Sequence, residues 1–149
     1  MSARKVQFCS GSNILNGFDN HDGDVNINER LPFGDGSMEF VFIEHGLEHT
    51  DCACGLKFLD EAYRILQPGG VIRICVPTLK LITDRNHARS LCLGHGHQML
   101  YCMETLHQML WCAGFSDIRE TGRKDTDGHW RVIGEPLDTQ ETLRMEATK

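Results

Sequence analysis

Histidines and cysteines occur in two groups whose composition suits a metal ion. Each group holds two histidines and two cysteines within a short stretch, and both residue types bind zinc. The groups are His45, His49, Cys52 and Cys54, and then Cys92, His95, His97 and Cys102. Neither spacing is that of a known zinc motif, and free cysteine is often simply buried. We therefore expect no metal site, although structural zinc stays open at either group.

The seven cysteines are an odd number without regular spacing, which indicates reduced thiols. The composition is 40% hydrophobic and 24% charged, with a formal net charge of −6. These values argue against disorder and against a nucleic-acid partner. No apolar run approaches the ~20 residues of a membrane helix, and the first residues lack a signal peptide. The sequence thus predicts a cytoplasmic protein with no membrane partner.

Strand and helix patterns alternate along the chain. Runs of β-forming residues predict strands over 5–9, 39–43, 71–76, 115–120 and 142–147. Apolar residues at helical spacing predict a helix that is capped by Thr50 or Asp51 and ends at Pro68, and a second helix over 103–113. Residues 79–96 fit either a short helix or a loop, and residues 125–137 fit a loop.

This order of elements predicts an α/β fold. Strands that alternate with helices usually form a parallel sheet, so we expect a Rossmann-like, mostly parallel, doubly wound sheet. Only a loop separates the last two strands, which should therefore form an antiparallel hairpin at the C-terminal edge. The length of 149 residues fits a single domain over 1–149.

Two stretches carry a resemblance to a known family. One strand ends in His45-Gly46-Leu47-Glu48-His49, and a helix runs through Tyr63-Arg64 and Pro68-Gly69-Gly70 into the next strand. Leu31-Pro32-Phe33 and Ala113-Gly114-Phe115 fit the same pattern in the same order. Together these motifs resemble the class I S-adenosylmethionine-dependent methyltransferases, most closely the small methyltransferases associated with glycosyltransferases.

The resemblance implies where the cofactor, S-adenosylmethionine, binds. The turn Cys9-Ser10-Gly11 matches the nucleotide-binding turn, in which the family has glycine at the place of Cys9. Asp22 matches the acid that binds the ribose, since a carboxylate accepts two hydrogen bonds in fixed geometry. The remaining matches are Asn26 and Ile27 in the adenine region, and Ile43, Glu44 and His45 at the next strand end.

The matched positions also show departures from the family. Gly11 and Asp22 are too close for a full helix between them, so the resemblance implies a shortened first crossover. Asn26 stands where the family often has an acid, and Thr78 follows Pro77 where the family often has aspartate.

His45 is the candidate catalytic residue. The resemblance places it at the strand end that faces the cofactor, and a hydroxyl acceptor needs a general base. Alternatively, His45 and His49 hold the loop by hydrogen bonds, while Glu48 orients the turn or caps the helix. His97 and Tyr101 match a stretch that lies over the active site in the family, and their alternative is a surface loop.

The resemblance implies methyl transfer to a small-molecule acceptor, with a sugar-related acceptor as one option. The alternative is a catalytically degenerate relative with a cofactor-binding or protein-interaction role, which Cys9 and Thr78 favour. A homodimer stays open, because the chain has no evident segment that caps an acceptor site other than 79–96. A nicotinamide oxidoreductase is disfavoured, since the turn lacks G-x-G-x-x-G.

Overall fold

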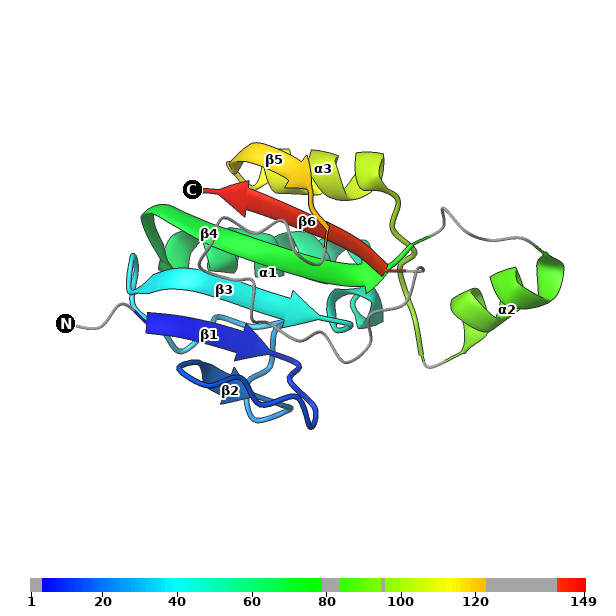
Figure 1. Cartoon of the computed structure of the whole chain (residues 1–149), viewed down its shortest axis with the longest axis horizontal. Coiled ribbons are helices and arrows are strands. Elements are labelled where there is room, and N and C mark those ends of the chain that lie inside the picture. The colour runs from blue at the N-terminus through cyan, green and yellow to red at the C-terminus, as the bar shows by residue number, and fades with distance from the viewer. Residues whose placement is uncertain (1–3, 79–83, 95, 123–141) are drawn as a thin grey trace.

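A six-stranded mixed sheet forms the centre of the molecule (Figure 1). The computed structural model describes residues 4–78, 84–94, 96–122 and 142–149. The strand order is β2-β1-β3-β4-β6-β5. The strands are β1 (Arg4–Phe8), β2 (Asp19–His21), β3 (Met38–Glu44), β4 (Leu66–Pro77), β5 (Ser116–Glu120) and β6 (Thr142–Thr148).

The sheet is wound in both directions from β1. This strand pairs in parallel with β2 on one side and with β3 on the other, and β3 pairs in parallel with β4. Strand β6 is antiparallel to both β4 and β5. The predicted α/β fold, with a mostly parallel doubly wound sheet and an antiparallel C-terminal edge, is confirmed. The sequence did not indicate that β6 lies between β4 and β5.

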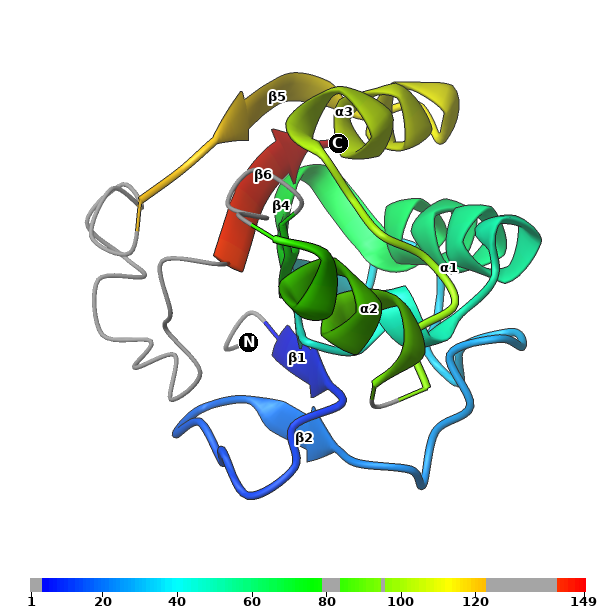
Figure 2. The same cartoon turned by 90° about the vertical axis from the view of Figure 1, so that its right-hand side faces the viewer.

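Two helices cover one face of the sheet (Figures 1 and 2). These are α1 (Cys52–Ile65) and α3 (Met103–Cys112), and the Asp51 side chain caps α1 by accepting a 2.8 Å hydrogen bond from the Cys54 N–H. Helix α2 (Arg85–Leu93) lies beyond the carboxyl ends of the parallel strands, and it makes residues 85–93 of the ambiguous stretch 79–96 helical. The 3-10 turn η1 (Leu47–His49) follows β3 directly.

No helix forms between β1 and β2, so the first crossover is short, as expected. Asn20 holds this loop closed: its side-chain oxygen accepts from the Leu15 N–H and its amide donates to the Leu15 carbonyl, both at 3.0 Å. Leu15 and Phe18 then pack on Phe40 and Phe42, across the sheet from α1 and α3. The loop therefore supplies apolar cover that a crossover helix would otherwise give.

The Tyr63-Arg64 motif ties α1 to two other segments. Arg64 donates hydrogen bonds to the carbonyls of Leu31 at 3.1 Å and Phe33 at 2.8 Å, which fixes the loop before β3. The Tyr63 ring lies 5.1 Å from the Phe115 ring, edge to face. A Cβ at Gly114 would lie 3.3 Å from the Tyr63 ring, so glycine permits this close approach.

The Pro68-Gly69-Gly70 turn was expected to separate a helix from a strand that starts at residue 71, and this boundary was wrong. Helix α1 ends earlier, at Ile65, and β4 begins at Leu66 and runs through the turn. Gly69 has a φ of 78°, and a Cβ at Gly70 would lie 2.9 Å from the Gln67 carbonyl oxygen. The two glycines therefore allow a tight turn within an extended segment here, and they do not mark the end of the helix.

The described part of the chain contains no helix with the length and apolar character needed to cross a membrane.

Candidate functional site

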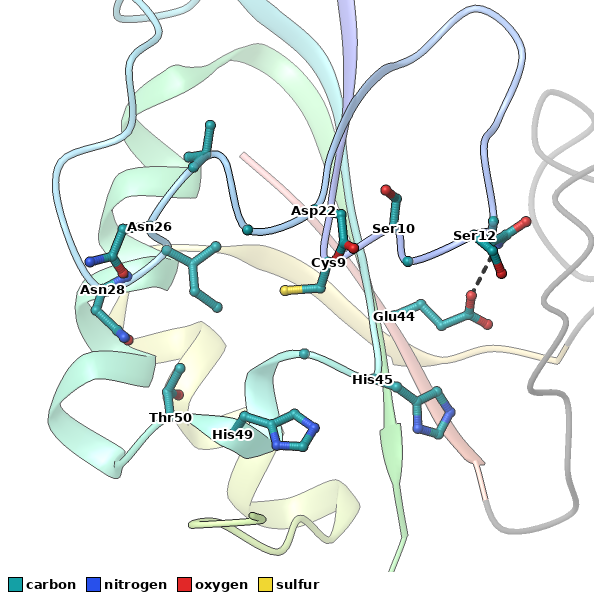
Figure 3. A pocket seen from close by; sticks show the side chains of 16 residues that line it. Cys9, Ser10, Ser12, Asp22, Asn26, Asn28, Glu44, His45, His49 and Thr50 are labelled. Atoms are coloured by element: carbon teal, nitrogen blue, oxygen red, sulfur yellow. Dashed lines mark hydrogen bonds between the residues drawn. The ribbon is translucent and has the colours of Figure 1, made fainter. Parts of the chain in front are cut away.

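A cavity of about 840 Å³ opens at the carboxyl ends of the first three strands in the chain (Figure 3). It lies where the sheet order reverses around β1, which is where ligands bind in open α/β sheets. Its volume lies within the ~300–1,000 Å³ of typical small-molecule pockets. The lining residues come from three strand ends and are Cys9 to Asn13, Asp22, Gly23, Val25 to Asn28, Glu44 to Gly46, His49 and Thr50.

The turn after β1 exposes backbone to the cavity. Gly11 has a φ of 51°, and a Cβ built there would meet no protein atom within 4 Å. The turn is closed by a 2.8 Å hydrogen bond from the Asn13 N–H to the Ser10 carbonyl, and the Ser10 N–H donates to the His21 carbonyl at 3.0 Å. A ligand can therefore approach the bare backbone at Gly11 closely.

Cys9 occupies a backbone conformation that favours glycine. Its φ is 56°, a region that costs an L-residue roughly 1–2 kcal/mol. Its side chain lies against Gly46, because a Cβ added at Gly46 would be 2.5 Å from the Cys9 sulfur. Gly46 thus leaves the room that the Cys9 side chain takes. Burial raises the pKa of the Cys9 thiol to about 11, with help from the carboxylates of Glu48 and Asp22, so the thiol stays protonated at neutral pH.

The segment after β2 brings Asp22 to the cavity wall. The Asp22 N–H donates to the Asp24 side chain at 2.9 Å, and Asp24 in turn pairs with the His21 ring at 2.7 Å. The hydrogen bond with His21 lowers the pKa of Asp24. Further along, the Asn26 side chain accepts from the Asn28 N–H at 3.0 Å and forms a turn at the cavity edge.

The end of β3 contributes two polar residues to the cavity. Glu44 is only 5% exposed and accepts a 3.2 Å hydrogen bond from the Asn13 amide, which links the two strand ends (Figure 3). His45 has a φ of 49°. Its Nε2 lies 3.4 Å from the Thr142 hydroxyl, and its Nδ1 lies 3.6 Å from a Glu48 oxygen. Strained residues of this kind cluster at functional sites, and two of them, Cys9 and His45, line this cavity.

The structure brings the predicted cofactor residues around one cavity, apart from Ile43. That side chain is fully buried in the core beneath Gly46. Sequence reasoning missed Ser12, Asn13, Gly23, Val25, Asn28, Gly46, His49 and Thr50 as lining residues. Ser12, Asn13 and Gly46 lie within four residues of a predicted strand end, and this position was the signal that could have found them.

The described residues of the two candidate zinc groups do not come together as ligand sets. Among the described residues, the one group of three or more possible ligands is Glu48, His49 and His97. The Cys54 thiol instead interacts with Asp51 at the start of α1, and this contact raises the pKa of the thiol. His95 of the second group lies outside the described residues.

Tyr101 is not part of a surface loop. Its side chain is fully buried in the main core, and burial raises the pKa of its hydroxyl. Its segment pairs with the end of β4 through a bridge between Thr78 and Tyr101. Tyr101 therefore anchors the chain before α3 and does not line the cavity.

Comparison with known proteins indicates which proteins share this arrangement. A family model described as a methyltransferase domain matches residues 5–74. No curated protein matched the chain by sequence. The structure is similar to an S-adenosylmethionine-dependent methyltransferase from Thermotoga maritima, with a TM-score of 0.66 and 16% identity over 100% of this chain and 83% of that chain.

Two further structures agree. A methyltransferase of the same cofactor class from Archaeoglobus fulgidus has a TM-score of 0.65 and 18% identity over 99% of this chain and 87% of that one. Phosphoethanolamine N-methyltransferase 2 from Haemonchus contortus, solved with S-adenosylmethionine, has a TM-score of 0.67 and 14% identity over 99% of this chain and 48% of that one. The chain therefore has the fold of the S-adenosylmethionine-dependent methyltransferases, with a methyltransferase-domain sequence pattern over residues 5–74.

Proposed function

We propose that the protein binds S-adenosylmethionine in this cavity and transfers its methyl group to a small molecule. The observation that carries the proposal is the bare turn at Gly11 beside the carboxylate of Asp22, at the reversal of the sheet. The residues fit the cofactor, since Gly11 leaves open a space that a side chain would fill and the polar groups converge from three strand ends. A sugar-related acceptor rests on the sequence resemblance alone.

Each part of the cavity has groups suited to one part of the cofactor. The Asp22 carboxylate would accept hydrogen bonds from the ribose hydroxyls. The turn at Ser10 and Gly11, with the Glu44 carboxylate next to it, would hold the charged methionine end. The segment with Asn26 and Ile27 would border the adenine. These assignments follow the order of the residues around the cavity wall (Figure 3).

His45 is our candidate for the catalytic group. When bound, S-adenosylmethionine supplies an electrophilic methyl on a positively charged sulfur. A hydroxyl acceptor that takes this methyl must lose its proton, and an imidazole beside the cavity can accept it. The contacts of His45 with Thr142 and Glu48 would keep the ring in place. A binding-only protein is the competing function, and it predicts cofactor binding without turnover.

Replacing Asp22 by alanine should weaken binding of S-adenosylhomocysteine by about 5- to 150-fold, the equivalent of ~1–3 kcal/mol for hydroxyls left without a partner. Isothermal titration calorimetry measures the change. Asp60→Ala is the matched control, because Asp60 is exposed on α1 and does not line the cavity. Equal affinity of the Asp22 variant and wild type would show that the ribose lies elsewhere.

Replacing His45 by glutamine should lower methyl transfer by roughly 100-fold or more, the usual contribution of a general base. Its affinity for S-adenosylhomocysteine should stay within about twofold, because the base acts on the acceptor. The assay follows radiolabelled methyl transfer to a panel of small acceptors. His107→Gln on α3 is the control, since His107 does not line the cavity. Full turnover in the His45 variant would remove it from the chemistry.

A further inference from the structure

Glu48 is a buried carboxylate whose local surroundings do not satisfy it. Its exposure is 1%, and neither side-chain oxygen accepts a hydrogen bond. The His45 Nδ1 lies 3.6 Å and the His49 Nε2 lies 3.8 Å from its Oε1, too far for a hydrogen bond. Burial of a carboxylate is costly unless it is paired or binds a metal. The arrangement therefore calls for a cation next to Glu48.

Besides His45, the imidazoles of His49 and His97 lie close to this carboxylate. Glu48 and His49 lie on η1, and His97 comes from the segment that follows α2. One possible ligand atom from each of the three lies within 4.8 Å of the others. The rings of His49 and His97 are 5.0 Å apart and steeply inclined, at 70°. The side chains of Glu48 and His49 from η1 and of His97 from the segment after α2 thus approach one small space.

Backbone hydrogen bonds build this juxtaposition. The N–H groups of Gln98 and Met99 both donate to the Glu48 carbonyl, at 2.8 and 3.1 Å. The Gln98 side chain also donates to the His49 carbonyl at 2.8 Å. Because these bonds come from the two residues that follow His97, they hold the chain at His97 next to η1 despite the long sequence separation. The cluster is therefore a product of the fold and not a chance meeting of surface side chains.

We propose that Glu48, His49 and His97 bind one divalent transition-metal ion, of which zinc is the best match. Two imidazoles and a carboxylate are a known ligand set for zinc, and three protein ligands leave a coordination position open. Zinc bonds of about 2.0–2.1 Å in a tetrahedral site bring ligand atoms to about 3.3 Å from one another. The side chains must then close in by rotation, which the partly exposed imidazoles allow.

The position of the ion suggests its role, and this part rests on the proposed function. His49 lines the cavity, so the ion would lie at the cavity edge near His45 (Figure 3). An open coordination site there would bind an oxygen of the methyl acceptor and polarise it. The acceptor would then carry a hydroxyl or carboxylate that can coordinate the ion.

Metal binding by the full chain tests the proposal without any activity assay. After chelator treatment and dialysis, the protein is titrated with zinc in a calorimeter and with cobalt by visible absorption. We expect one ion per chain, and a rise in melting temperature with zinc, because a ligand that binds the folded state stabilises it. Loss of an outer-shell partner costs about 10–100-fold in metal affinity, so loss of a ligand should cost roughly 100-fold or more.

Three variants and two controls separate this site from other sources of binding. Glu48→Gln, His49→Ala and His97→Ala should each lose the ion, whereas His107→Ala and a Cys52→Ser/Cys54→Ser double variant should keep it. The partly exposed His49 and His97 carry the test if Glu48→Gln fails to fold. Absence of binding to wild type, or binding that is lost only in the cysteine variant, would overturn the site. If the protein binds zinc at this site but fails to bind S-adenosylhomocysteine in a separate titration, the metal site stands and the proposed function is rejected.

Discussion

Replacing Arg73 by methionine is expected to lower the free energy of unfolding by about 3–5 kcal/mol, because it leaves a charge buried without its main partner. Arg73 is 2% exposed, and its guanidinium donates to the Thr121 hydroxyl at 2.9 Å and to the Glu146 carboxylate at 3.0 Å. Arg73 on β4 and Glu146 on β6 lie opposite each other in the sheet. The remaining cation, Arg119, is 3.6 Å from the other Glu146 oxygen and is partly exposed.

The loss should depend on pH. Burial raises the pKa of Glu146, and Arg73 and Arg119 act against this rise. A carboxyl with a raised pKa in the folded state contributes stability at low pH that is lost as the pH rises through that pKa. Without Arg73 the pKa of Glu146 should rise further. The difference in unfolding free energy between variant and wild type should therefore be smaller near pH 5 than near pH 7.5. Chemical denaturation at both pH values measures it.

A double replacement supplies the control. Arg73→Met/Glu146→Leu removes both charges and should recover most of the lost stability, since apolar pairs often replace buried ion pairs without loss. A loss below about 1 kcal/mol in the single variant, or one that is equal at both pH values, would contradict this account of the β4–β6 pair.

Replacing Gly46 by alanine should destabilise the protein by about 1–3 kcal/mol, the usual cost of forcing an extra group into a packed site. The new Cβ would lie 2.5 Å from the Cys9 sulfur and 2.7 Å from the Cys9 Cβ. Rotation of the sulfur alone cannot relieve the second contact. The side chain that moves would enter the cavity, so affinity for S-adenosylhomocysteine should fall as well.

Cys9→Gly should rescue the Gly46→Ala variant. Glycine adopts the φ of 56° at this position without strain and removes both clashing atoms. Denaturation of the wild type, both single variants and the double variant forms a double-mutant cycle, with an expected coupling of at least ~1 kcal/mol. Additive effects would mean that the Cys9 side chain does not lie against Gly46.

The sequence was sufficient for the fold class and for most of the strands, but not for β2 or for the place of β6 in the sheet. The family resemblance assigned residues such as Gly11, Asp22 and Glu44 to one site, and the fold brings them together because parallel strands place their carboxyl ends at one edge of the sheet. The turn at Gly69 and Gly70 was misjudged because Pro-Gly-Gly also ends helices. The sequence alone did not distinguish the two outcomes.

Long-range contacts were beyond the reach of the sequence. The fit of Cys9 against Gly46 depends on the distance between two loops, which no local pattern encodes. In the same way, His49 was grouped with nearby cysteines, whereas the fold brings His97 and Glu48 to it. The resemblance placed Ile43 in the site, but alternation along β3 turns its side chain into the core.

Calorimetric titration of the wild-type protein with S-adenosylhomocysteine tests the central claim most directly. The account predicts saturable binding of one ligand per chain, accompanied by a rise in melting temperature. The absence of both binding heat and thermal stabilisation at millimolar ligand would contradict a cofactor site at Gly11 and Asp22.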